Sequence, residues 1–217
     1  MKINVIISRP YSEVRNICHG IKNSDLNSLK KAAFWLAVLI PDKSILIPVP
    51  GHDSRQTYMR LIGTAAVFEA EKLGKDIRVL FALDGKEHPS LCELKEKGLP
   101  VDGVDLGIRW STPEKDYRQC LEKNIAEGYR PVLIDNVIDT GKTIKACLDV
   151  IGDADVAVLG NTGRWTRECI SKGDVINYRA NSVKVKKILD DGLLIRDPYG
   201  VEQVIDWEDV AQYNQTF

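Results

Sequence analysis

Short runs of consecutive apolar residues alternate with longer segments of mixed polarity through most of the chain. Each run is rich in Val, Ile and Leu and is bounded by polar or turn-forming residues, which is typical of a buried strand. The predicted strands lie at 3–7, 44–51, 76–83, 130–138 and 154–161. The intervening segments predict helices that end near residue 40 and that span 53–74, 113–128 and 142–152. Continuous apolar strands alternating with helices predict an α/β fold with a parallel sheet covered on both faces.

The first helical region has a start signal near its middle. Ser24 and Asp25 both carry side chains that can accept a hydrogen bond from the first turn of a helix. Apolar residues then recur at a spacing of three or four, which predicts one buried face made of Leu26, Leu29, Ala33 and Leu36.

Two segments depart from the α/β pattern. The region 84–113 is long, polar and weakly periodic, and long connections of this kind in compact domains are often lids. After residue 171, short segments of alternating polarity are separated by turn-forming "DDG" and "DPYG". This rhythm predicts a small antiparallel β appendage and resembles a Src-homology-type small barrel. We therefore expect two domains, an α/β domain at 1–171 and a small β domain at 172–217.

Composition narrows the classes of partner. Lys and Arg total 30 and Asp and Glu total 31, so the formal net charge of −1 favours neither nucleic acid nor an anionic membrane surface as the main partner. The longest apolar run, residues 32–40, is shorter than the ~20 residues that span a bilayer. The five cysteines are scattered without metal-ligand spacing, which favours reduced thiols and a cytoplasmic protein.

The stretch "VLIDNVIDTGKTI", at 132–144, leads from a predicted strand into a predicted helix. One interpretation is a nucleoside-triphosphate loop, which requires the pattern G-x-x-x-x-G-K-[ST]. Gly141, Lys142 and Thr143 match its end, but Asn136 stands where the first glycine is needed. A bulky residue there removes the tight turn that wraps the phosphates, so the sequence argues against this interpretation.

The same stretch resembles the ribose-5-phosphate signature of the type I phosphoribosyltransferases. That signature is an apolar run, two acidic residues, two apolar residues and D/T-T-G-x-T, and the "DTGKT" at 139–143 is most similar to the hypoxanthine-guanine branch. The resemblance implies the parallel sheet of that family and binding of 5-phosphoribosyl 1-pyrophosphate (PRPP) with Mg²⁺. It also implies transfer of the phosphoribosyl group to a nitrogen nucleophile, either a nucleobase or an amine. Members of the family commonly self-associate, which implies a homodimer.

The resemblance assigns a role to each residue of the motif. Asp135 and Asn136 would hold the ribose hydroxyls, with Asp135 acting directly or beside Mg²⁺. The 5′-phosphate would bind where a helix start offers N–H donors, at Asp139, Thr140, Gly141, Lys142 and Thr143. Asn136 departs from the family, because an amide replaces its second acid and supplies no charge to a metal.

Two residues of the motif have alternative interpretations. Asp139 would assist proton transfer at the attacking nitrogen by resemblance, whereas the residue type alone equally suits a helix N-cap. Lys142 would lie near the phosphate or would be a solvent-facing lysine in the first helical turn. Both alternatives stay open at the level of sequence.

Further site residues are implied by their position relative to the predicted strands. Pyrophosphate would bind after the strand at 44–51, at Gly51, His52 and Arg55, with Arg60 as a second cation. Lys86 and Arg109 lie in the region where the family carries its catalytic lid.

The base-binding end of the predicted site gives fewer signals. Trp165 follows the strand at 154–161 and could stack on a base. The purine-using branch of the family has a lysine near this strand end, where this chain has Asn161. The sequence therefore does not assign hypoxanthine or guanine as the substrate.

Two other functions compete with phosphoribosyl transfer. Asn136 and the missing base-reading lysine also fit a regulatory protein that binds PRPP or a nucleotide without turnover. Alternatively, the β appendage carries the function by binding a partner, and the α/β domain serves as its scaffold.

Overall fold

The computed structural model describes residues 4–52, 58–89, 94, 97–100, 104–162, 172–173, 175–178, 181–207 and 215–216, without the side chains of 4–8, 176–178, 181 and 215–216. Its central element is a sheet in the order β12-β1-β7-β6-β2-β3. The strands are β1 (Asn4–Pro10), β2 (Ser44–Pro48), β3 (Ile77–Val79), β6 (Arg130–Ile138), β7 (Asp155–Asn161) and β12 (Gln215–Thr216). Neighbouring strands are parallel except β12, which runs antiparallel to β1. The predicted α/β class with a mostly parallel sheet is confirmed.

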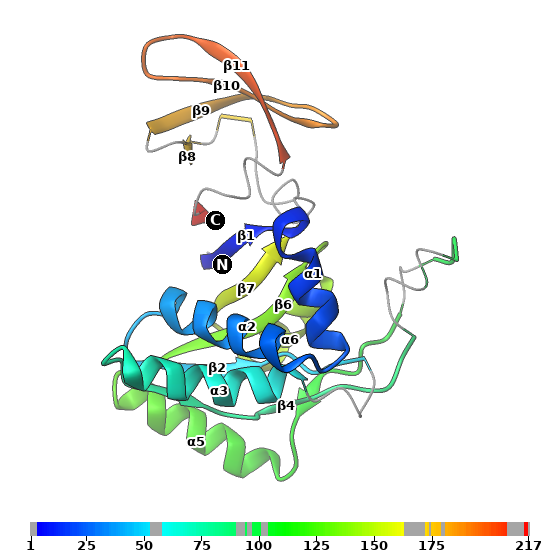
Figure 1. Ribbon diagram of the computed structural model, residues 1–217, viewed down its shortest axis with the longest axis vertical. Coiled ribbons are helices and arrows are strands. Elements are labelled where there is room, and N and C mark those ends of the chain that lie inside the picture. Colours follow the sequence, from blue (N-terminus) through cyan, green and yellow to red (C-terminus); the bar gives the residue numbers. More distant parts are fainter. Residues whose placement is uncertain are drawn as a thin grey trace.

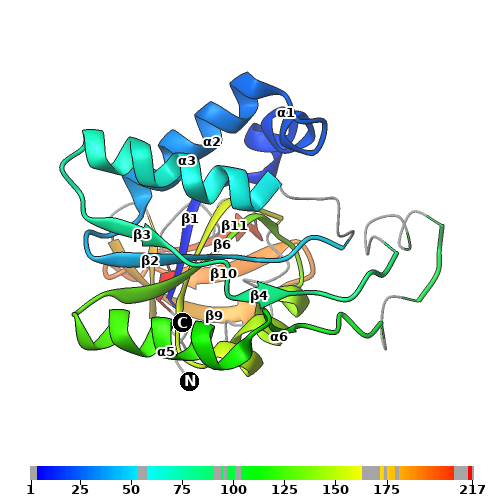
Figure 2. The same ribbon diagram turned by 90° about the horizontal axis from the view of Figure 1, so that it is seen from below.

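Helices cover both faces of this sheet (Figures 1 and 2). One face carries α1 (Tyr11–Lys22), α2 (Leu26–Leu39) and α3 (Tyr58–Lys72), and the other carries α5 (Glu114–Ala126) and α6 (Lys142–Ile151). None of the helices in the described ranges combines the length and the apolar character that crossing a membrane requires.

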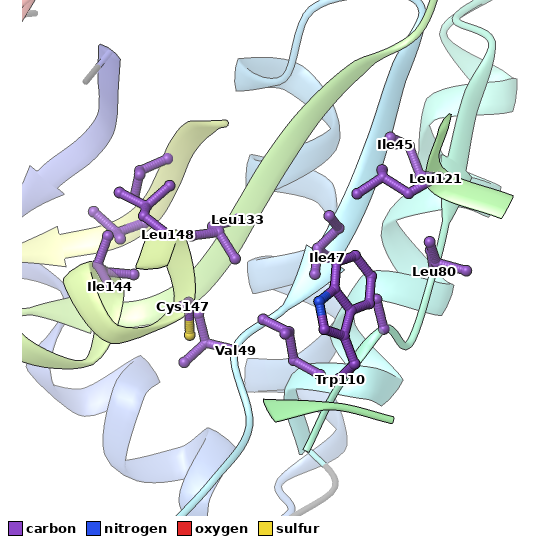
Figure 3. Close-up of a cluster of buried hydrophobic side chains, with 14 of the residues drawn as sticks. Ile45, Ile47, Val49, Leu80, Trp110, Leu121, Leu133, Ile144, Cys147 and Leu148 are labelled. Carbon is purple, nitrogen blue, oxygen red and sulfur yellow. The ribbon is translucent and has the colours of Figure 1, made fainter. Parts of the chain in front are cut away.

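Alternate residues of the strands point to opposite faces of the sheet and contribute to two hydrophobic cores. Ile134 of β6 packs with α2 and α3, whereas its neighbour Leu133 packs on the side of α5 and α6. Figure 3 shows Leu133 and Ile47 between Cys147 of α6 and the ring of Trp110. Leu133 and Ile134 are both fully buried, and each such side chain stabilises the fold by about 1.5–3 kcal/mol.

The helix ends follow the predicted signals in part. Asp25 caps α2, because its carboxylate accepts a hydrogen bond from Ser28 N at 2.9 Å. Ala33 and Leu36 are buried as predicted, but Leu26 is 62% exposed and lies off the buried face.

The predicted strand at 76–83 is interrupted. Leu80 N still donates to Leu46 O of β2 at 2.8 Å, whereas Ala82 O accepts from Ser111 N at 2.8 Å. The backbone thus leaves β2 and pairs instead through β4 (Leu83–Asp84) with the antiparallel β5 (Arg109–Trp110). The predicted long connection begins and ends at this ladder, and its described residues project away from the main sheet (Figure 2).

The C-terminal region contains a separate antiparallel sheet in the order β11-β10-β9-β8 (Figure 1). Its strands are β8 (Val175–Tyr178), β9 (Asn181–Ile188), β10 (Gly192–Arg196) and β11 (Glu202–Asp206). The sheet has its own small core, made of Val183, Val185, Leu193, Ile195 and Ile205. The antiparallel appendage is therefore confirmed, whereas its closure into a barrel and the boundary at 171/172 stay predictions. Beyond it, β12 returns to the main sheet.

Candidate functional site

The order of the parallel strands reverses between β2 and β6. The chain leaves β2 through α3 and returns in β3 on one side, whereas it leaves β6 through α6 and returns in β7 on the other side. The two crossover helices lie on opposite faces, so the loops that follow β2 and β6 diverge above the carboxyl ends of the strands. In open α/β sheets, ligands bind at such a topological switch point.

Asp135 occupies this point because β6 extends further than β2. Pairing between the two strands ends at Ile134, opposite Pro48, and Val49 N makes a last hydrogen bond to Ile134 O at 3.0 Å. On its other side, β6 stays paired with β7 as far as Ile138, opposite Asn161. Asp135 is the first residue of β6 beyond its pairing with β2.

The Asp135 carboxyl is placed in a poorly solvated environment. Burial raises its pKa from the ordinary value of 3.8 to about 7. A hydrogen bond from Asn136 N to its Oδ1, at 2.7 Å, and the positive charge of Lys22 oppose this rise. Because water solvates this carboxyl poorly, it is suited to bind a cation or the hydroxyl donors of a ligand.

Three other side chains lie close enough to respond to the charge of Asp135. Burial is the main cause of the raised pKa values of Cys18, Tyr58 and Cys147, and the negative charge of Asp135 adds to each. They come from α1, α3 and α6 respectively. Sequence reasoning missed all three, because each is an ordinary core residue until the fold places it beside Asp135.

Asn136 is buried, with 6% of its surface exposed. Its backbone carbonyl accepts a hydrogen bond from Cys18 Sγ at 3.8 Å, whereas its side-chain Nδ2 has no hydrogen-bond partner in the part of the chain that the structure describes. A buried donor without a partner costs about 1–3 kcal/mol. Burying an amide here costs less free energy than burying a second carboxylate beside Asp135, because the amide adds no charge.

The loop after β6 ends at Gly141, which is the N-cap of α6. Gly141 adopts φ of 72°, a left-handed conformation in which other residues are strained, and its carbonyl accepts the first helical hydrogen bond from Lys145 N at 2.8 Å. The interpretation of Asp139 as the N-cap is therefore wrong, since it lies two residues earlier. The half-buried hydroxyls of Thr140 and Thr143 make no hydrogen bond within the described ranges.

Asp139 is instead joined to the end of β7. Its Oδ1 accepts a hydrogen bond from Thr162 Oγ1 at 2.6 Å, and Thr162 N donates to Ile138 O at 3.1 Å. The carboxylate is thus oriented by a neighbouring strand, which leaves a role in proton transfer as a prediction. Lys142 is half-buried in the first turn of α6, and both of its interpretations stay predictions.

The loop after β2 contacts the start of the long connection between β4 and β5, residues 85–108, which we call the excursion. His52 O accepts a hydrogen bond from His88 N at 3.1 Å, and the two imidazole rings lie 6.0 Å apart between centroids. Gly51 and His52 are half-buried at the carboxyl end of β2. Arg55 and Trp165, predicted to bind pyrophosphate and to stack on a base, lie outside the described residues.

Two of the remaining predicted cations form ion pairs with acidic residues other than Asp135. Arg60 forms an ion pair with Asp84 at 2.8 Å and so joins α3 to β4. Lys86 pairs with Asp105 at 3.6 Å within the excursion, and Arg109 is exposed on β5. Their contribution to ligand binding stays a prediction.

Helix α1 crosses the carboxyl ends of three neighbouring strands, which the sequence did not reveal. It begins directly after β1, and at Gly160 of β7 an added Cβ would lie 2.5 Å from Val14 Cγ2. One turn later Cys18 contacts Asn136 of β6 through its hydrogen bond. In Figure 1, α1 accordingly runs from the end of β1 past β7 and β6.

The donor set is compatible with a metal held largely by a ligand. Within the described residues, no group of three or more His, Cys, Asp or Glu side chains is placed to hold a metal ion. Mg²⁺ is often bound by one or two carboxylates together with substrate phosphates, and Asp135 could supply one such carboxylate. No protein-family model matches the chain, and a search of curated proteins finds no match.

Proposed function

We propose that the chain is a phosphoribosyltransferase that binds PRPP at the switch point between β2 and β6. The observation that carries the proposal is the left-handed Gly141, which opens α6 six residues after Asp135 at the carboxyl edge of the parallel sheet. The first N–H groups of a helix carry partial positive charge and suit a phosphate. A carboxyl on the preceding strand suits ribose hydroxyls, so the two features together fit a ribose 5-phosphate.

The reaction would need no covalent intermediate with the protein. The bond between the anomeric carbon and the pyrophosphate oxygen breaks, the bond to the incoming nitrogen forms, and pyrophosphate leaves. Asp139, oriented by Thr162 at 2.6 Å, would accept the proton that the nitrogen loses. Asp135 would stabilise the positive charge that develops on the ribose. Mg²⁺, held by Asp135 and the substrate, would neutralise charge on the pyrophosphate.

Binding can be tested by calorimetry with PRPP in the presence of Mg²⁺. We expect the wild-type protein to bind, and Asp135→Ala to bind at least about tenfold more weakly because the ribose hydroxyls lose a charged acceptor. Asp149→Ala, which removes an exposed carboxylate from the last turn of α6, serves as the matched control. Absence of PRPP binding at millimolar concentration to the folded wild-type protein would exclude the proposal.

A second candidate function is binding of PRPP or a nucleotide without turnover. Asn136 favours it, because the buried amide supplies no charge where the family has an acid. Release of pyrophosphate, measured over a panel of nucleobases and amines, separates the two functions. Binding of PRPP without release by any acceptor would favour the regulatory function.

A further inference from the structure

Lys22 lies at the end of the path that α1 takes across the sheet. Val14, Cys18 and Lys22 recur every fourth residue, so they follow one side of the helix. Val14 meets β7 at Gly160, and Cys18 meets β6 at Asn136. The next position along this line is Lys22, and the next strand beyond β6 in the sheet is β2.

The electrostatics agree with this placement. Burial raises the pKa of both Asp135 and Cys18, and the positive charge of Lys22 lowers each by a smaller amount. Lys22 is exposed, and within the described part of the chain it has neither a hydrogen bond nor an ion pair. An uncommitted ammonium group near the switch point is well suited to an anionic ligand, since it loses no protein partner on binding.

The 5′-phosphate and the pyrophosphate of PRPP would face helices on opposite sides of the sheet. Helix α6, whose first turn would hold the 5′-phosphate, lies on the face opposite to α1 and α3. Lys22 belongs to α1, on the face opposite to α6. Its charge is therefore available to the other end of the ligand.

We infer that Lys22 is a binding residue for the pyrophosphate group of PRPP, an inference that rests on the function proposed above. Lys22 lies on α1, which precedes β2 and β6 in the chain, so the N-terminal segment contributes a residue to the site. A flexible ammonium group can follow the pyrophosphate as it departs, whereas the helix N-terminus holds the ribose 5-phosphate in place.

The test compares three ligands by calorimetry: PRPP, inorganic pyrophosphate and ribose 5-phosphate. We expect Lys22→Ala to weaken PRPP and pyrophosphate by about tenfold to a hundredfold, the usual effect of losing one charge-assisted hydrogen bond. Affinity for ribose 5-phosphate should stay within about twofold, and Lys22→Arg should restore part of the lost affinity. Lys123→Ala is the matched control, because it removes an exposed lysine from the last turn of α5, the helix that leads to the amino end of β6.

The outcomes separate this inference from the proposed function. Unchanged PRPP affinity in Lys22→Ala, or an equal loss for ribose 5-phosphate, would overturn the role of Lys22 while leaving PRPP binding intact. A folded wild-type protein that binds none of the three ligands would overturn both. A selective loss for the two pyrophosphate-containing ligands supports the role of Lys22.

Discussion

Val14 of α1 lies directly against Gly160 of β7, with room for no side chain between them. A Cβ atom added at residue 160 would come within 2.5 Å of Val14 Cγ2. This contact sets how closely α1 approaches the carboxyl ends of the strands. It therefore also sets the distance from Cys18 and Lys22 to Asp135.

Gly160→Ala should displace α1. We expect a loss of about 1–3 kcal/mol in the free energy of unfolding, the usual result of overpacking a core, together with weaker binding of PRPP. The double variant Val14→Ala/Gly160→Ala makes space for the new methyl group and should lose less than the sum of the two single variants. Urea unfolding measures all four proteins, and strictly additive losses would show that the two side chains do not meet.

Asp135 should make stability depend on pH. Its folded-state pKa, about 7, lies above its ordinary value of 3.8, so the folded protein holds a proton that the unfolded chain has released. Stability should therefore fall as the pH rises from about 4 to about 7. Asp135→Asn removes this cost and should raise the free energy of unfolding near pH 8 by up to about 4 kcal/mol, at ~1.36 kcal/mol per pKa unit. The gain should be smaller near pH 5, and an equal gain at both pH values would contradict the assignment.

Gly141→Ala should affect both stability and ligand binding. An alanine at φ of 72° costs about 1–2 kcal/mol, and its methyl group also enters the space where the backbone would approach a phosphate. Gly128→Ala is a close control, because Gly128 has φ of 88° after α5 with nothing within 4 Å of an added Cβ. Both variants should lose stability in thermal unfolding, but only Gly141→Ala should lose affinity for ribose 5-phosphate. Comparable affinity in the two variants would argue against the phosphate site.

Thr162→Val should change the pH dependence of turnover. The substitution keeps the shape of the side chain but removes the hydroxyl that donates to Asp139 at 2.6 Å. A carboxylate that loses this donor holds its proton more strongly, so the acid limb of kcat/KM should move to higher pH. Thr64→Val removes a hydroxyl bonded to Arg60 O on α3 and should leave the profile unchanged. A profile that Thr162→Val does not move would remove Asp139 from the proton-transfer step.

The parts of the fold that depend on residues close together in the sequence could be predicted from the sequence. The strand and helix around Asp135 follow from one continuous pattern of apolar residues, turn residues and glycine. The break after β3 was not predictable, because residues 80 and 82 are both apolar although they bond to different strands. Leu26 likewise fits the apolar period of α2, but it precedes the point at which that helix meets the core.

The candidate site was predictable on β6 and not on α1. Asp135, Asn136 and Gly141 share one stretch, so their proximity follows from the chain itself. Cys18 and Asn136 are 118 residues apart, and the pattern of α1 shows only that one side of the helix is buried. Which strand that side covers is a property of tertiary packing. Lys22 therefore could not be distinguished from any other surface lysine until the path of α1 was known.

The β4–β5 ladder has a consequence for how this protein could change over time. The chain leaves the main fold at Asp84 and returns at the paired residue Arg109, so the two ends of the intervening excursion lie side by side. Lengthening such a loop raises its closure entropy only with the logarithm of its length, about 0.6 kcal/mol per doubling. Insertions or deletions between His88 and Leu106 would leave the paired strands and both cores in place. The excursion is thus a position where sequence and length can diversify while the remainder of the protein is inherited unchanged.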